Sequence, residues 1–332
     1  MSPRRRYFDG VAGLTQYPAG PHASACAEAV EGPIGRFAAT APGERPPTGP
    51  GPTAERLRHY EAGAMMARAG LARSRPDAGR TVDRTSAEDI VVLPGAYDRV
   101  QDVLDRLDLP YTMLPPAELA GTTLDPSQIL IANCPGDVGT GIGEVRRFVA
   151  EGGTLLSTDW ALDRLVAQAF PGTVEPTGGS TADAVVGVRP GCGTHPLLEG
   201  AFGRGDSARW WLEVGSYPIR VRWWSGVTVL LESGELRRRW GASPVAVLFG
   251  HGRGEVYHMI SHFYLQRSDE AGARPGRSAR EWAKQRGTRF RPGELEGITA
   301  RQLESATSSA RLLLNLIADK RVRVEEDRRA AG

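Results

Sequence analysis

The chain of 332 residues contains 40% hydrophobic and 24% charged side chains, which is ordinary for a globular protein and excludes a disordered or fibrous chain. Its 41 lysines and arginines nearly balance its 39 aspartates and glutamates, so the net charge of +2 creates no overall field that would attract nucleic acid or anionic lipid. We therefore expect neither a nucleic acid nor a membrane as a partner.

Residues 1–85 differ from the rest of the chain in being rich in Ala, Gly, Pro and Arg. Such a segment buries too little apolar surface to offset its ordering entropy, so we predict that it is largely flexible. One helix is expected within it, over residues 53–74, where Thr53 can cap a run with apolar residues at helical spacing. No apolar stretch has the length of a signal peptide or of a membrane span. We expect a cytoplasmic protein.

Strands and helices alternate between residues 89 and 170. Short apolar runs predict buried strands, and the segments between them carry apolar residues at helical intervals. This alternation indicates a doubly wound α/β fold, with a mostly parallel sheet and helices on both faces. In chain order, the predicted strands are 89–95, 111–114, 128–136 and 154–158, and the predicted helices are 96–109, 143–153 and 159–170.

The C-terminal half is richer in strands. Five β-type runs separated by Gly, Ser and Pro turns lie between residues 183 and 260. We expect a single main domain over residues 86–267, followed by a mobile polar excursion at 268–297. A helix over 298–332, with Thr299 and Gln302 as its capping box, is expected to pack on the domain.

The stretch "TLLSTDWAL" predicts a strand, a tight turn and a helix. A turn of this kind places one side chain at the carboxyl edge of a parallel sheet, where ligands of such folds bind. Thr158 or Asp159 occupies that position, and the amino terminus of the following helix favours a negative charge there. The alternative is that Asp159 serves only as the cap of that helix.

His262 follows the predicted strand "GEVYHMI" and falls at the same edge of the sheet. A histidine in that place can act as a general base near neutral pH. His258, four residues earlier, is expected to be a buried structural histidine. The pair has the spacing of two metal ligands on a helix, but the context predicts a strand and Met259 stands where a zinc-protease motif has glutamate. We expect no metal site and no cofactor.

Cys134 is the second of three cysteines, which are few, odd in number and without metal-ligand spacing. It ends a predicted strand and is followed by Pro135, which lacks the backbone N–H that stabilises an oxyanion beside a nucleophile. We expect Cys134 to be a small apolar strand residue.

Five segments, in this order, resemble the class I glutamine amidotransferase-like superfamily of flavodoxin-like fold: "VVLPGAYDRVQDVLDRLDLPYTML", "QILIANCPG", "VRRFVAEGGTLLSTDWAL", "THPLLEG" and "GRGEVYHMISHF". Within it they are most similar to the branch without amidotransferase activity, which includes ThuA-like proteins and the GIFT domain of an intraflagellar transport protein. The resemblance covers residues 89–267.

In catalytic members of that superfamily a cysteine stands on the turn after the strand that matches residues 154–158, and a histidine followed by glutamate stands after the strand that matches 254–260. The resemblance places His262 at the histidine position. Thr158 and Asp159 occupy the cysteine's turn, and Tyr264 stands where the glutamate is usual. The resemblance thus implies that amidotransferase activity is absent.

The sequence therefore predicts a non-catalytic domain that binds a small ligand or a protein partner at the carboxyl edge of its sheet, and a homo-oligomer is compatible with this. The alternative is a hydrolase for a small polar substrate, with His262 as general base and Asp159 as nucleophile or orienting carboxylate. A scaffold with a vestigial pocket is a third reading. The residues expected around the pocket are Asn133, Gly136, Thr158, Asp159, Trp160, Ser261 and His262.

Overall fold

The computed structural model describes residues 6–7, 54–203, 208–222, 226–263 and 278–331. None of the helices in these ranges combines the length and the apolar character needed to cross a membrane. The first part of the predicted flexible segment, apart from residues 6–7, lies outside the described residues, as does Tyr264.

A nine-stranded sheet forms the centre of the molecule, in the order β1-β3-β2-β4-β5-β13-β12-β11-β8. The strands from β1 to β13 in this order are parallel to their neighbours. All residues of β2, β4 and β5 are buried, which explains why these strands are nearly continuous apolar runs. The parallel strands are β1 (Arg6–Tyr7), β3 (Thr112–Met113), β2 (Ile90–Leu93), β4 (Ile129–Ala132), β5 (Thr154–Thr158) and β13 (Gly254–Met259).

Antiparallel strands extend the sheet beyond β13 and build two small sheets beside it. Within the central sheet, β12 (Pro244–His251), β11 (Thr228–Glu232) and β8 (Arg189–Pro190) continue the order. The small sheets pair β10 with β6 and β7 with β9. Their strands are β6 (Val174–Pro176), β7 (Ala184–Gly187), β9 (Arg209–Leu212) and β10 (Ile219–Val221). This is the β-rich C-terminal half that the sequence predicts.

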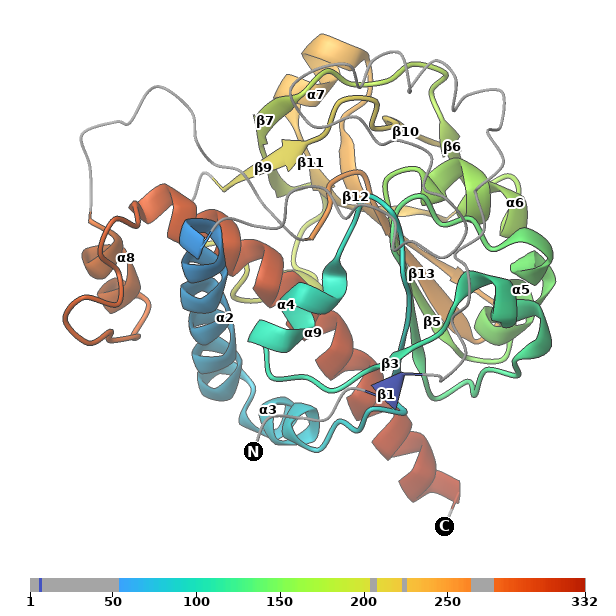
Figure 1. The fold of residues 1–332 in the computed structure, drawn as a ribbon, viewed down its shortest axis with the longest axis horizontal. Coiled ribbons are helices and arrows are strands. Elements are labelled where there is room, and N and C mark those ends of the chain that lie inside the picture. Colours follow the sequence, from blue (N-terminus) through green and yellow to red (C-terminus); the bar gives the residue numbers. More distant parts are fainter. Residues whose placement is uncertain (1–5, 8–53, 204–207, 223–225, 264–277, 332) are drawn as a thin grey trace.

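Helices cover both faces of the central sheet (Figure 1). On one side lie α2 (Ala54–Ser74), α3 (Pro76–Asp83), α4 (Val100–Arg106) and the long α9 (Ala300–Ala331). On the other lie α5 (Ile142–Ala150) and α6 (Ala167–Ala169), which follows a π-helical turn over Leu162–Val166. The predicted α/β class, with a mostly parallel sheet, helices on both faces and one main domain, is confirmed. Short 3₁₀ turns at Pro116–Gly121, Gly139–Gly141 and Pro196–Leu198, and helix α7 (Gly234–Trp240), complete the main body.

Helix α2 packs closely along α9, although the composition of residues 1–85 predicts a largely flexible region. A Cβ on Gly63 would lie 2.7 Å from the Ala306 Cβ, so the two helix backbones nearly touch at this point. The Arg311 side chain, 1% exposed, donates from Nη1 to the Ala67 carbonyl (3.1 Å) and from Nη2 to the Ser74 Oγ (2.8 Å). Residues 54–83 are therefore part of the folded body, because small residues let α2 approach α9 and larger ones such as Leu71 and Val82 pack into the core.

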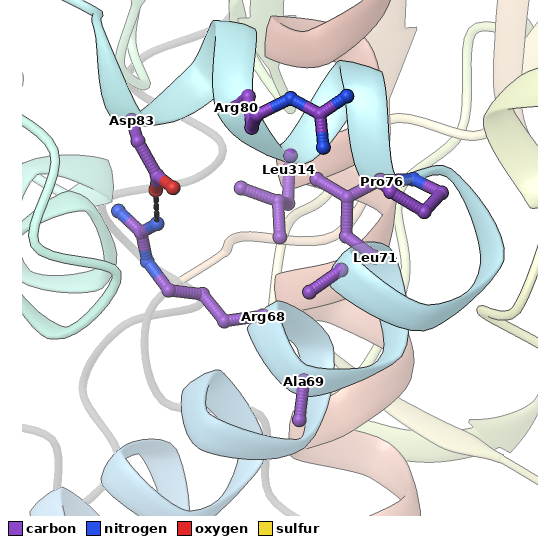
Figure 2. A pocket seen from close by; sticks show the side chains of 9 residues that line it. Arg68, Ala69, Leu71, Pro76, Arg80, Asp83 and Leu314 are labelled. Carbon is purple, nitrogen blue, oxygen red and sulfur yellow. Dashed lines mark hydrogen bonds and ion pairs between the residues drawn. The ribbon is translucent and has the colours of Figure 1, made fainter.

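A cavity of about 470 Å³ lies where α2, α3 and α9 meet (Figure 2). Its walls include Leu71 of α2 and Leu314 of α9, and Arg68 reaches across to Asp83 with 2.6 Å between Nη1 and Oδ1. The Arg68 Nε also donates to the Leu107 carbonyl, at 2.6 Å. With both ends of its guanidinium engaged, Arg68 ties the two N-terminal helices to the loop after α4.

Residues 278–298 also differ from the mobile polar excursion that the sequence predicts over 268–297. They contain helix α8 (Ala279–Gln285), which begins at a capping box formed by Ser278 and Glu281. Trp282, 4% exposed, joins a small apolar cluster with Met66 of α2 and Leu303 of α9. The following helix, α9, starts after the predicted capping box, in which the Thr299 amide donates to the Gln302 Oε1 (2.8 Å). Residues 264–277 lie outside the described part of the chain.

Candidate functional site

Four ionisable side chains meet at the carboxyl edge of the central sheet. Asp98 follows β2, Cys134 follows β4, Asp159 follows β5 and His262 follows β13. These four strands are neighbours in the parallel part of the sheet, so the residues after them lie side by side. The Asp159 amide donates to the Met259 carbonyl (2.8 Å), which joins the ends of β5 and β13.

Asp159 stands on the turn after β5 in a left-handed backbone conformation, with φ of 45°. Residues other than glycine adopt this conformation rarely, and it turns the side chain away from the path of the strand. The Asp159 carboxylate accepts hydrogen bonds from the Ser216 Oγ (2.9 Å) and the Tyr217 amide (3.1 Å). Both oxygens thus bind the loop between β9 and β10. Asp159 therefore does not serve only as a helix cap, which is the alternative interpretation of the sequence.

His262 lies between two carboxylates. Its Nε2 is 3.4 Å from the Asp159 Oδ2, and its Nδ1 is 3.5 Å from the Glu213 Oε1. Burial acts to lower the pKa of His262, but Glu213, Asp98 and the contacts with Asp159 and Cys134 together raise it well above its ordinary value. His262 therefore carries a positive charge at neutral pH in this arrangement, which balances part of the surrounding negative charge.

Two of the carboxylates beside His262 were not expected from the sequence. Glu213 belongs to the loop after β9, in a small sheet that the sequence does not place next to β13. Asp98 is fully buried, and burial raises the pKa of its carboxyl group. Its Oδ1 accepts a hydrogen bond from the Arg99 amide at 2.6 Å, and the nearby His262 imidazole and Thr158 hydroxyl offset part of that rise in pKa.

Cys134 also belongs to this cluster, rather than being only a small apolar strand residue. One ligand atom from each of Cys134, Asp159 and His262 lies within 4.8 Å of the other two. The peptide bond before Pro135 is cis, and the Cys134 amide donates to the Thr158 Oγ1 (3.1 Å). Burial, with Asp159 close by, raises the pKa of the Cys134 thiol to about 12. The thiol is therefore protonated at neutral pH.

Trp160, predicted to lie near the pocket, closes over the cluster together with two tyrosines. Its ring meets Tyr97 edge to face with 5.0 Å between centroids, and it stacks on Tyr217 at 6.0 Å. The Trp160 Nε1 donates to the Gly215 carbonyl at 2.8 Å, which fixes the ring in place. Trp160 is 8% exposed and Cys134 is 1% exposed, so the cluster is enclosed.

The other predicted site residues make bonds that hold the loops around the cluster. Thr158 receives the Cys134 amide, and the Ser261 Oγ donates to the Trp211 carbonyl (2.7 Å). The Asn133 Nδ2 donates to the Gln101 Oε1 (3.0 Å), which directs this amide towards α4. A Cβ on Gly136, where φ is 71°, would lie 2.3 Å from the Ala161 Cβ, so this position requires glycine for close packing.

His258 lies apart from these groups. Its Nδ1 is 3.0 Å from the Ser157 Oγ, in the buried interior of the sheet, and burial lowers its pKa to about 3. The two histidines that share metal-ligand spacing in the sequence therefore have different surroundings, and the strand rather than a helix carries His258.

Comparisons with known proteins give only distant likenesses. No protein-family model matches the chain, and no curated protein matches its sequence. Among solved structures, similar arrangements occur in a β-galactosidase from Bacillus circulans sp. alkalophilus (14% identity, TM-score 0.38) and a protein described as ThuA-like from Bacteroides uniformis ATCC 8492 (10% identity, TM-score 0.37). The aligned regions cover 55% of this chain and 31% of the galactosidase, and 54% of this chain and 83% of the ThuA-like protein. Likenesses of this size say nothing about what the chain binds or does.

Proposed function

We propose that the carboxyl edge of the central sheet binds a small polar molecule, and that the domain is not a glutamine amidotransferase. The observation that carries the proposal is the convergence of Asp98, Cys134, Asp159 and His262 from four strand ends into one buried cluster. Burial of ionisable groups is costly unless they are paired or serve a ligand. The strained backbone of Asp159 adds to that cost.

The same geometry argues against glutamine hydrolysis by a cysteine. Asp159 occupies the turn on which such enzymes place their nucleophile, and a carboxylate cannot form a thioester with the glutamine side chain. Cys134 stands on the neighbouring strand end, and its high pKa keeps it a thiol at neutral pH. The nucleophile position is therefore occupied by a carboxylate, and the neighbouring cysteine is a protonated thiol in the metal-free chain.

The enclosure of the cluster favours a small ligand over a protein partner. Asp159 is 2% exposed and His262 is 4% exposed, and the Trp160 ring is wedged between those of Tyr97 and Tyr217. A protein surface cannot reach these polar atoms without displacing the aromatic side chains. A molecule of a few heavy atoms needs much less movement, and its polar groups would meet carboxylates and an imidazole.

Ligand binding is tested by thermal unfolding of the chain, once in EDTA-containing buffer and once with Co²⁺ in place of EDTA, with amino acids, short dicarboxylates, amides and monosaccharides as separate probes. At least one probe should raise the midpoint of the wild type and not that of Asp159→Asn. Asp77→Asn is the matched control, because the Asp77 side chain is 93% exposed on α3. The proposal would be contradicted if no probe stabilised the wild type, or if the probes stabilised Asp159→Asn as much as they stabilised Asp77→Asn. Glutamine should release no ammonia above the background rate.

A hydrolase is the second candidate, and one observation favours it: Asp159, His262 and Glu213 are arranged in series. Asp159 could attack a saturated carbon of the substrate, such as that of an epoxide or an alkyl halide, which would form an alkyl ester with the enzyme and expel the leaving group. A water molecule would then cleave that ester, with His262 accepting its proton and Glu213 orienting the imidazole. Formation of the ester neutralises Asp159, one of the groups that hold His262 protonated. His262 would give its proton to the leaving group in this first step, which leaves a neutral imidazole to accept a proton from water in the second.

Isotope labelling separates this mechanism from simple binding. Turnover of a panel of epoxides and alkyl halides in ¹⁸O-enriched water should place ¹⁸O in the carboxylate of Asp159, because water attacks the carbonyl carbon of the enzyme ester. Mass spectrometry of the peptide that contains Asp159 detects the label, and His262→Gln should stop turnover after the ester has formed. Hydrolysis of these substrates that persists in Asp159→Asn would contradict the mechanism.

A further inference from the structure

We propose that Cys134, Asp159 and His262 bind a divalent transition-metal ion of the Zn²⁺ type. This inference rests on the proposed function, because it places the metal at the same site. The metal would be the group that binds the polar molecule. One sulfur, one oxygen and one nitrogen ligand atom lie within 4.8 Å of one another in a buried cluster. This mixture of donors suits Zn²⁺ and Co²⁺ rather than Mg²⁺ or Ca²⁺, which prefer oxygen alone.

The spacing of two of the three donors fits a shared ion. Zn–N and Zn–O bonds of about 2.0–2.2 Å at a tetrahedral angle place two ligand atoms about 3.3–3.6 Å apart. The His262 Nε2 and the Asp159 Oδ2 are 3.4 Å apart. This distance exceeds the roughly 2.9 Å of a good N–H···O hydrogen bond and matches two ligands of one metal.

The surroundings resemble the support that metal ligands usually have. Glu213 lies 3.5 Å from the His262 Nδ1, on the side of the ring away from Asp159, which is where a carboxylate orients a metal-bound histidine. The Ser216 hydroxyl and the Tyr217 amide hold the Asp159 carboxylate in the same way. Each of these two candidate ligands is therefore positioned by a further group.

Asp98 provides an independent observation. Its side chain is fully buried, and the His262 imidazole lies close enough to interact with its charge. Together with Asp159 and Glu213 it gathers three carboxyl groups around one imidazole. A bound cation would displace the protons that His262 and Cys134 carry in the metal-free chain and would balance the charge of the carboxylates. Its fourth coordination position, left open by the three protein ligands, would take water or the polar molecule.

The site differs from the metal motif considered in the sequence. His258 is directed towards Ser157 in the sheet and is not one of the three candidate ligands. The ligands come instead from the ends of β4, β5 and β13, which are far apart in the sequence and adjacent in the sheet.

The test uses the untagged full-length chain, treated with EDTA and dialysed, and Co²⁺ as the probe. We expect about one Co²⁺ per chain and the near-ultraviolet charge-transfer absorption of a thiolate bound to cobalt. The absorption should disappear in Cys134→Ser and persist in Cys192→Ser, since Cys192 is the other free cysteine among the described residues. His262→Gln and Asp159→Asn should weaken binding at least tenfold, and Glu213→Gln should weaken it about 10–100-fold.

Circular dichroism of the metal-free variants shows whether they are folded, and if Cys134→Ser is not, the calorimetric titration of His262→Gln decides. Failure of the folded wild type to bind Co²⁺, absorption that survives in Cys134→Ser, or equal affinity in His262→Gln would overturn the inference. Stabilisation by an organic probe in EDTA, without Co²⁺ binding, would overturn the metal site and leave the proposed function standing. Co²⁺ binding, with no organic probe stabilising the protein, would overturn the proposed function and leave the metal site standing.

Discussion

Replacing Trp210 with alanine is expected to lower the free energy of unfolding by about 3–5 kcal/mol. Trp210 lies on β9 and is fully buried, and its Nε1 donates to the Ser308 Oγ of α9 at 3.0 Å. The substitution removes the largest fully buried side chain and leaves a cavity between the small sheet and α9. Ser308 keeps a second partner, the Ser305 carbonyl, so most of the cost comes from lost packing.

Chemical denaturation monitored by circular dichroism measures this loss. Trp240→Ala is the matched control, because Trp240 is only partly buried at the end of α7, where the Arg239 guanidinium lies 4.2 Å from its ring centroid. We expect the control to lose clearly less stability. Equal losses in the two variants would show that the junction of β9 and α9 is not part of the main core.

Acid should destabilise the protein through His258. Burial lowers its pKa to about 3 in the folded chain, against about 6.5 in the unfolded chain, so between these values only the unfolded chain binds the proton. Unfolding is then favoured as the pH falls below 6.5, by about 1.4 kcal/mol per pH unit, or roughly 2 kcal/mol at pH 5. The contribution of His258 is fully present above pH 6.5.

Comparison of denaturation at pH 7 and pH 5 isolates this contribution, because other titrating groups are common to the proteins compared. His258→Gln should lose about 2 kcal/mol less than the wild type between these two pH values. Ser157→Ala is the control, since it removes the hydroxyl 3.0 Å from the His258 Nδ1 and leaves the imidazole buried. An unchanged pH dependence in His258→Gln would contradict the expectation.

The sequence pattern predicts the sheet well, because its parallel strands are apolar runs bounded by clear turns. Two site residues, Asp159 and His262, are predictable for the same reason, since each directly follows such a strand. Glu213 is not predictable in this way, because it reaches His262 from a loop after β9, outside the central sheet. For Cys134, the adjacent Pro135 argues only against a role as nucleophile. It carries no information about how close the thiol lies to the ends of two neighbouring strands.

The packing of the terminal helices depends on features that overall composition hides. Helix α2 contacts α9 through small residues such as Gly63 and Ala67, so a low content of large apolar side chains suggests a loosely attached segment where the structure has a packed one. Helix α8 relies on one aromatic side chain, Trp282, in an otherwise polar stretch. In both places the decisive contact is local, and the proportion of apolar residues in the segment does not reveal it.

Helix α2 also reaches the candidate site. Tyr60, buried on α2, donates its hydroxyl to the Phe263 carbonyl at 2.8 Å, and Phe263 is the residue after His262. The backbone that carries the imidazole is thus anchored to a helix 203 positions earlier in the sequence. A shortened chain beginning at residue 86 would lose this anchor, and it would also expose the surface of α9 on which α2 packs. Residues 54–85 therefore have to be retained in any fragment intended to preserve the position of His262.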